Sequence, residues 1–285
     1  MASRQLVQAI KATRTQRGLT LVELVVTIVL MGILAGGTAA FVVSSTQSYV
    51  DTATRNQLSA IARLTLLKLE KEIGNAVPNS IRTTDSSSGD QCIEFFPIED
   101  VTRYISVNFG SESASLTVKP FVRGQSLQGA KYPIIFPVAA SSLYAQSNPG
   151  PLGVISDYEQ ASPVPSVETL NLAAAHEYQI GTNRKTVYLA GAPVSFCVVG
   201  TRMFRYRDYG IVSEQCSPST PSCLPDAPPQ RALVSDQLDN SGLDNSFEYL
   251  SADLMRGGLV RVFLNFSDGD ESLELEHEIN ISNAP

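Results

Sequence analysis

The chain has 285 residues, with 21 Lys and Arg against 28 Asp and Glu, and a net charge of −7. This acidic balance argues against a nucleic-acid-binding protein, which needs clustered cations to displace counterions from phosphates. The length is sufficient for a helical tail with one sizeable domain or two small ones.

The N-terminal 43 residues combine a basic leader with a long apolar run. Residues 1–18 contain no acid and four basic residues, which are Arg4, Lys11, Arg14 and Arg17. From Leu19 to Val43, about 25 residues, the only ionisable side chain is Glu23. This run is long enough to cross a bilayer of roughly 30 Å, and the basic flank predicts a cytoplasmic leader.

Two simpler interpretations account for part of this pattern. A secretory signal has a short apolar core before a small-residue cleavage site, and Ala35–Gly37 lies too deep in a run that continues. A plain signal anchor accounts for the length and the basic flank but not for Glu23. A carboxylate in hydrocarbon costs on the order of 3 kcal/mol, so Glu23 indicates a function.

The segment from Arg17 to Glu23, with a glycine followed five residues later by an acid, resembles the N-terminus of type IV prepilins and type II secretion pseudopilins. The resemblance implies that a prepilin peptidase cuts between Gly18 and Leu19 and methylates the amine of Leu19. The family usually has Phe at that position. It also implies that Glu23 meets the amine of a neighbouring subunit in a filament. Cleavage would leave 17 basic against 28 acidic residues, a net charge of −11.

A single long helix is predicted from about Thr20 to Ile73. No proline occurs before Pro78, and Leu58, Ile61, Leu64 and Leu67 recur at helical spacing, which predicts one apolar face. We therefore expect an α+β, type IV pilin-like fold, with a long N-terminal helix packed on an antiparallel β-sheet body. The expected domains are the leader 1–18, the helical segment 19–77 with 19–43 transmembrane, and a β-rich globular domain over 78–285.

Downstream of Pro78 the sequence is typical of short strands separated by turns. The predicted strands are 92–97, 101–109, 115–122, 132–138, 178–190, 193–200, 202–207, 231–235, 258–266 and 272–282. The segment Ser267–Asp270 predicts a hairpin turn between the last two. The Ser-, Pro- and Gly-rich segments 141–167 and 213–230 are predicted to be loops.

Four cysteines on the translocated side of a membrane predict two disulfides, for which three pairings are possible. Cys216 and Cys223 are close in sequence, which favours a small clip and leaves Cys92 to pair with Cys197. A zinc site is the alternative, but the gap of six residues does not match a CxxC pair.

The sequence offers no catalytic constellation. The two histidines, His176 and His277, lie outside any HExxH motif, and there is no GxSxG or phosphate-binding glycine motif, so we predict neither an enzyme nor a cofactor. The cluster with Asp236, Asp239 and Asp244 is a weak candidate for calcium, because hard cations prefer oxygen ligands. Its spacing does not fit an EF-hand, and such clusters usually form turns.

Four segments of the body add a closer resemblance, to the O-type minor pilins of the mannose-sensitive haemagglutinin (MSHA) pilus system. These segments are Asn75–Ser80, Cys92–Ile98, Pro193–Val199 and Glu276–Pro285. The resemblance implies a low-abundance subunit that initiates or caps a pilus near its tip. Its partners would be the prepilin peptidase, other major and minor pilins, the inner-membrane assembly platform and the membrane.

Two alternatives to an initiation subunit remain, a J-type minor pseudopilin of type II secretion and a pilus-tip adhesin. In each case the expected location is the inner membrane of a Gram-negative bacterium, with a single pass and a periplasmic body. The subunit would then move to the pilus at the cell surface.

Overall fold

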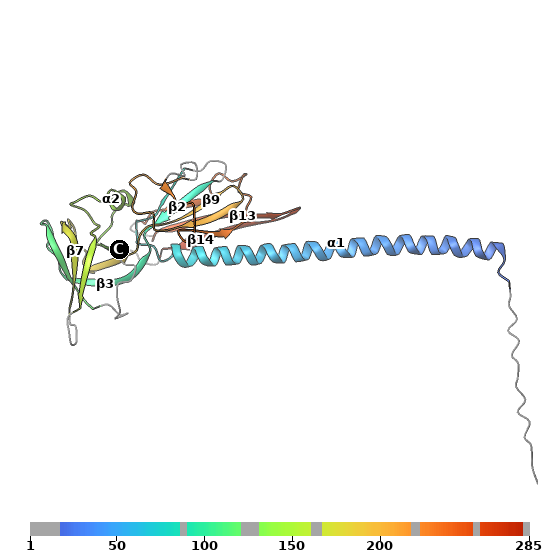
Figure 1. Ribbon diagram of the computed structural model, residues 1–285, viewed down its shortest axis with the longest axis horizontal. Coiled ribbons are helices and arrows are strands. Elements are labelled where there is room, and N and C mark those ends of the chain that lie inside the picture. The colour runs from blue at the N-terminus through green and yellow to red at the C-terminus, as the bar shows by residue number, and fades with distance from the viewer. Residues whose placement is uncertain are drawn as a thin grey trace, which may run out of the picture. The chain divides into compact units, whose positions relative to one another are not determined.

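The computed structural model describes residues 18–85, 90–120, 131–160, 167–217, 223–252 and 257–281 (Figure 1). The chain divides into two compact units, Met1–Ala53 and Thr54–Pro285. The predicted leader 1–18 ends at the edge of the described residues, so the domain limits 1–18, 19–77 and 78–285 stay predictions.

The first element, α1, is an α-helix over Leu21–Ile73, which confirms the predicted long N-terminal helix. Its 53 residues correspond to about 80 Å at 1.5 Å per residue. The absence of proline before Pro78 allows this continuity, because an internal proline removes a backbone hydrogen bond and clashes with the preceding turn. The helix crosses from the first unit into the second.

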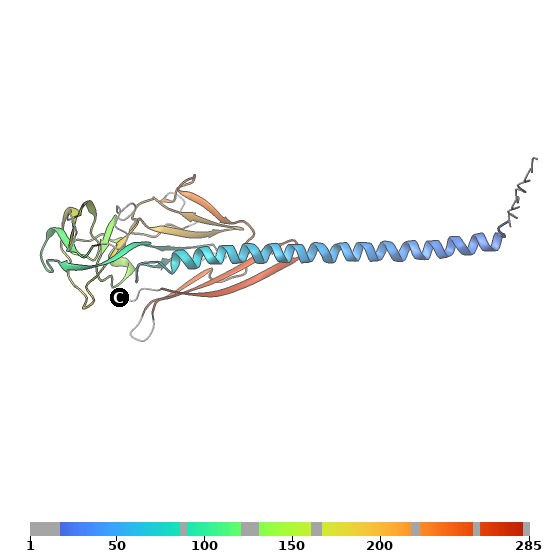
Figure 2. The same ribbon diagram turned by 90° about the horizontal axis from the view of Figure 1, so that it is seen from below.

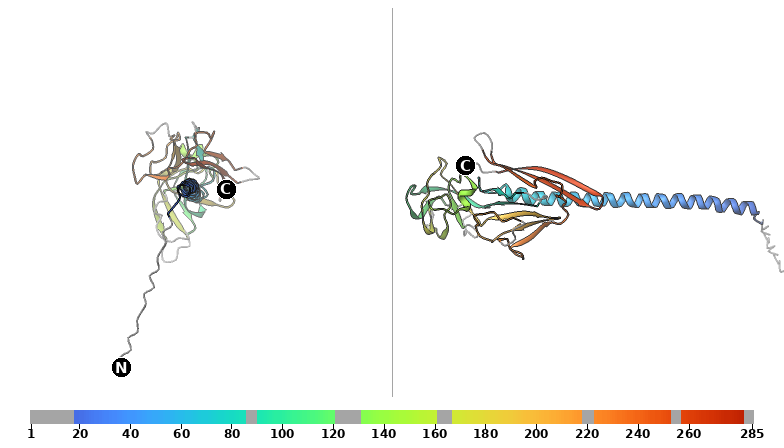
Figure 3. Two further views of the ribbon diagram at one scale, coloured as in Figure 1. Left: turned by 90° about the vertical axis from the view of Figure 1, so that its right-hand side faces the viewer. Right: turned by 90° about the horizontal axis from the view of Figure 1, so that it is seen from above.

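In the second unit, the C-terminal turns of α1 pack between two antiparallel sheets (Figures 2 and 3). The five-stranded sheet has the order β1 (Arg82–Thr83), β2 (Gln91–Phe95), β9 (Val194–Val199), β10 (Arg202–Tyr206), β11 (Arg231–Ser235). The three-stranded sheet has the order β12 (Phe247–Leu250), β13 (Leu259–Asp268), β14 (Glu271–Asn280). Their facing side chains and α1 form one hydrophobic core.

A third, six-stranded sheet is inserted in the chain between β2 and β9 and lies beyond the C-terminal end of α1 (Figure 1). Its order is β5 (Tyr132–Ile134), β8 (Thr186–Ala190), β3 (Ile98–Ser106), β4 (Ser113–Val118), β7 (Glu168–His176), β6 (Ile155–Gln160). A short helix, α2 (Ala140–Tyr144), packs nearby through Tyr144 against Phe96. The antiparallel β-sheet body confirms the predicted α+β fold class.

The buried stripe of α1 differs from the predicted one. The residues that α1 buries are Leu58, Ala62, Thr65, Leu69 and Ile73. Leu64 and Leu67, which were expected to share a face with Leu58, are 68% and 54% exposed. The expectation of a single apolar face was wrong because the helix carries apolar residues around more than half of its circumference, and the body covers only one side.

Several strand predictions also need correction. The predicted strand 178–190 is a strand only over Thr186–Ala190, and the predicted loop 141–167 contains part of α2 and all of β6. Strands β1, β7 and β12 had no counterpart among the predicted strands. The β13–β14 hairpin is as predicted, with Asp268 paired to Glu271 and Gly269 at a φ of 60°, a conformation that glycine adopts without strain.

The structure contains two disulfides, as the sequence predicts, joining Cys92 to Cys197 and Cys216 to Cys223. Cys92 and Cys197 lie directly opposite each other on β2 and β9. Cys216 packs in the same buried cluster as this pair. The clip therefore lies against the outer side of the five-stranded sheet.

Candidate functional site

The predicted processing site lies just ahead of α1. Gly18 and Leu19 precede the helix, and the side chain of Leu19 is 70% exposed. A Cβ added to Gly18 would meet no atom within 4 Å. The Gly18–Leu19 peptide bond is therefore outside the helix, and no other described part of the chain hinders it. Arg17 lies outside the described residues.

Thr20 begins the helix as its N-cap. Its Oγ1 accepts a hydrogen bond from the backbone N–H of Glu23 at 3.3 Å, and its carbonyl accepts one from Leu24 at 3.1 Å. Glu23 is thereby placed in the first turn, where its carboxylate interacts favourably with the positive end of the helix dipole. The role of Thr20 as a cap was not predicted from the sequence, although Thr-x-x-Glu is the spacing of a capping box. Loss of the leader would place the new α-amine one residue ahead of this cap.

The apolar part of α1 in the first unit is suited to hydrocarbon. Among the described residues, α1 is the one helix that is long and apolar enough to cross a membrane. Its threonines do not leave polar groups unsatisfied: the hydroxyls of Thr27, Thr38 and Thr46 donate to carbonyls three or four residues earlier, at 2.8–3.0 Å. Because unsatisfied polar groups are costly in lipid, these bonds make the segment compatible with a membrane.

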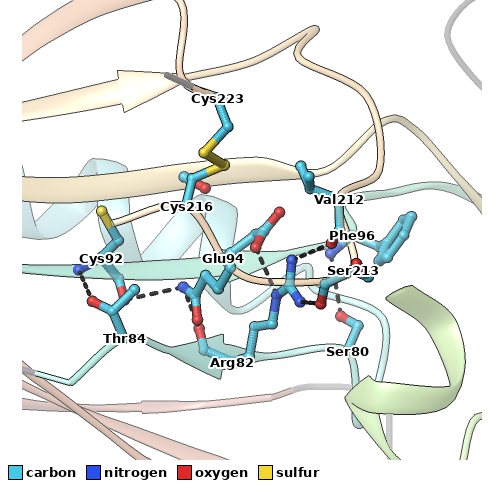
Figure 4. Close-up of polar contacts among 12 residues, drawn as sticks. Ser80, Arg82, Thr84, Cys92, Glu94, Phe96, Val212, Ser213, Cys216 and Cys223 are labelled. Atoms are coloured by element: carbon cyan, nitrogen blue, oxygen red, sulfur yellow. Dashed lines mark hydrogen bonds and ion pairs between the residues drawn. A yellow bond between two sulfur atoms is a disulfide. The ribbon is translucent and has the colours of Figure 1, made fainter. Parts of the chain in front are cut away.

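A buried polar cluster in the second unit is a separate candidate, centred on Arg82 of β1 and Glu94 of β2 (Figure 4). Arg82 Nε lies 2.7 Å from Glu94 Oε2, and the guanidinium also donates to the carbonyls of Val212 and Ser213 at 2.7 and 2.6 Å. The central guanidinium carbon of Arg82 lies over the ring of Tyr144, 3.5 Å from the ring centroid, in a cation–π contact. Arg82 therefore fastens the segment that leads into the Cys216–Cys223 clip.

Burial raises the pKa of the Glu94 carboxyl, and the hydrogen bond and charge of Arg82 oppose this rise. The hydroxyl of Tyr209 donates to Glu94 Oε1 at 3.0 Å and bonds Ser195 Oγ at 2.7 Å. Perturbed carboxyls occur in active sites and in structural ion pairs alike. Here the partners of Arg82 are strand and loop groups of the same body, which indicates a structural role. No local sequence pattern predicts this cluster, because Arg82 and Val212 are far apart in the chain.

The three aspartates of the weak calcium candidate do not form one group. The described residues contain no group of three or more His, Cys, Asp or Glu that could hold a metal ion, so Asp236, Asp239 and Asp244 do not come together as one. Instead, Asp239 accepts a hydrogen bond from Ser241, and buried Asn240 bonds both Ser246 and the backbone of Asn265. These contacts shape a turn.

Comparison with protein families finds a match at the N-terminus of the chain. The family model described as the prokaryotic N-terminal methylation motif matches residues 13–39. No curated protein and no solved structure matches the chain. The matched residues include the Gly18–Leu19 junction, Thr20 and Glu23, and they support a type IV prepilin-like family. The motif points to a structural subunit that is anchored in a membrane and assembles with other pilins.

Proposed function

We propose that this chain is a minor pilin of a type IV pilus of the MSHA type. A prepilin peptidase cuts it between Gly18 and Leu19 and methylates the amine of Leu19. The observation that carries the proposal is the methylation motif at the start of a capped helix, in an apolar run, Leu19–Val43, whose single acid is Glu23. The mature helix holds the subunit in the inner membrane until it enters the filament.

The role proposed for Glu23 follows from its position. A buried carboxylate and a buried amine each cost several kcal/mol in hydrocarbon unless they are paired. In a filament of staggered subunits, Glu23 of one chain reaches the Leu19 amine of the next chain out. A subunit that keeps this acid is suited to a place beneath at least one other subunit, near the tip of the filament.

The first experiment determines the mature N-terminus by mass spectrometry in a pilus-competent strain. We expect a methylated Leu19 in the wild type and an uncut chain for Gly18→Val. The matched control is Gly36→Val, downstream within α1, where an added Cβ also meets nothing within 4 Å and cleavage should be normal. A mature chain that begins near Gly37, or retains Met1, would contradict the proposal.

The second experiment compares Glu23→Ala and Glu23→Gln with the wild type. Both variants should be cleaved and inserted normally, yet should be recovered poorly with partner pilins in detergent. Deletion of the gene should reduce surface pili and leave type II secretion intact. Undiminished recovery of the partners with Glu23→Ala, together with a normal number of pili, would refute the pairing role.

A further inference from the structure

The side of α1 that faces away from the body forms a distinct surface, which we call the open face. It comprises Ala60, Arg63, Leu64, Leu67 and Lys71, which lie on the side opposite the buried stripe. Leu64 and Leu67 are 68% and 54% exposed, and Arg63 and Lys71 are exposed at either end. Lys68 and Glu70 lie at its margins. The open face thus has an apolar centre between two cations.

The three-stranded sheet presents a second surface, which we call the outer face. Side chains alternate along a strand, and the inner set of β13 and β14 packs against α1. The outer set includes Glu274, Glu276 and Glu278, all exposed, on β14. Beside them, Phe263 of β13 lies opposite Glu276, and Arg261 pairs with Glu278 at 3.0 Å and with Glu248 of β12 at 3.5 Å. The outer face therefore carries four acids, one cation and a central aromatic ring.

These two surfaces match in spacing as well as in charge. Arg63 and Lys71 are eight residues apart on a helix, or about 12 Å at 1.5 Å per residue. Glu274 and Glu278 are four residues apart on a strand, or about 14 Å at 3.4 Å per residue. Leu64 and Leu67 fall between the two cations, as Phe263 falls between the outer carboxylates.

We propose that the outer face of one copy of this chain binds the open face of α1 in a second copy. The two surfaces cannot meet within one body, because the inner side of the same sheet already packs against α1. A second copy is the indicated partner because this chain supplies both complementary surfaces. The contact is heterologous, so each copy keeps one surface free and a further subunit can follow. This contact is an interface between bodies, in addition to the proposed pairing of Glu23 with an amine. It rests on the proposed function only in that the function holds copies side by side in one membrane.

The test uses the full-length chain in membranes, with two copies that carry different affinity tags, solubilised in a mild detergent at low salt. One variant reverses the outer face (Glu274→Lys with Glu276→Lys), and the other reverses the open face (Arg63→Glu with Lys71→Glu). Each variant should recover its own second copy about tenfold less well than the wild type, because attraction becomes repulsion. High salt should weaken the wild-type contact, since exposed charges are screened.

Rescue is the decisive measurement. Mixing the two variants should restore recovery, because the reversed sheet then meets the reversed helix and the two native surfaces meet each other. A single chain with all four changes should also pair with itself. The matched control, Asp85→Lys with Glu214→Lys, changes the charge equally at exposed acids outside the outer face and should behave as the wild type.

Three results would overturn the inference. Recovery that no reversal changes would mean that copies associate through their membrane segments alone. A lack of rescue in the mixture would exclude direct pairing of the two surfaces. A photoreactive residue in place of Leu67 that links to a different protein, instead of giving an adduct of twice the subunit mass, would exclude a second copy. N-terminal mass spectrometry of the same samples separates these results from a failure of processing at Gly18.

Discussion

Replacement of Leu69 by alanine tests whether the C-terminal half of α1 is part of the body's core. Leu69 is fully buried (0% exposed) between the two sheets, in contact with the cluster that contains Phe95 and Val262. Truncation of a buried leucine removes its transfer free energy and leaves a cavity, at a combined cost of about 2–5 kcal/mol. For a domain of this size, that loss corresponds to a decrease in Tm of roughly 5–15 °C.

The matched control is Leu67→Ala, the same substitution in the same helix. Leu67 is 54% exposed, so its truncation should cost well under about 1 kcal/mol and leave Tm nearly unchanged. The chain has no Trp, so thermal unfolding of the full-length protein in detergent is best followed by circular dichroism with the disulfides kept oxidised. Equal decreases in Tm for the two variants would refute the docking of α1 through the Leu69 side.

Two further predictions concern the five-stranded sheet. Cys92→Ala should destabilise the body more than Cys216→Ala, because the two disulfides have sequence separations of 105 and 7. Loop-closure entropy predicts a stabilisation of about 4.8 kcal/mol for the long loop and about 2.5 kcal/mol for the short one, which thermal unfolding measures. Peptide mapping that finds a Cys197–Cys216 link would contradict the pairing. Glu94 has a pKa raised above 4.5 by burial, so the folded state keeps its proton to higher pH than the unfolded chain. This contribution to stability is complete below about pH 4.5 and is lost as the pH rises through the folded pKa, so the wild type should lose Tm relative to Glu94→Gln as the pH rises above about 4.5. A difference in Tm that stays unchanged as the pH rises would show that folding does not raise the pKa of Glu94.

Local patterns in the sequence were sufficient for the first part of the fold. The length of α1 follows from uninterrupted helical periodicity and from the position of Pro78, both of which act within a few residues. The β13–β14 hairpin follows from the turn chemistry of Ser267–Asp270. The N-terminal motif is equally local, since the glycine, the threonine cap and the acid lie within six residues.

The remaining elements depend on contacts that no local pattern encodes. Strand β6 is polar along Ile155–Gln160 and exists because β7 pairs with it at the edge of a sheet. Strand β1 has only two residues, and the ion pair from Arg82 to Glu94 and the bonds from Arg82 to the clip segment hold it in place. Whether a segment forms a strand depends mainly on the strands beside it, so edge strands such as β1 and β6 are not predictable from their own residues.

The C-terminal half of α1 carries more apolar residues than the packing of a single subunit requires. A helix that served only as a spine would need one apolar stripe, here the side of Leu58, Leu69 and Ile73, with polar residues elsewhere. Leu64 and Leu67 instead remain exposed between cations, on a surface that the body does not cover. Exposed leucines contribute nothing to the stability of a single subunit, whereas they contribute to an interface once a partner removes them from water. A stability measurement on one subunit should therefore be insensitive to Leu67, and recovery of a second copy should be sensitive to it, which separates the two faces of the helix by experiment.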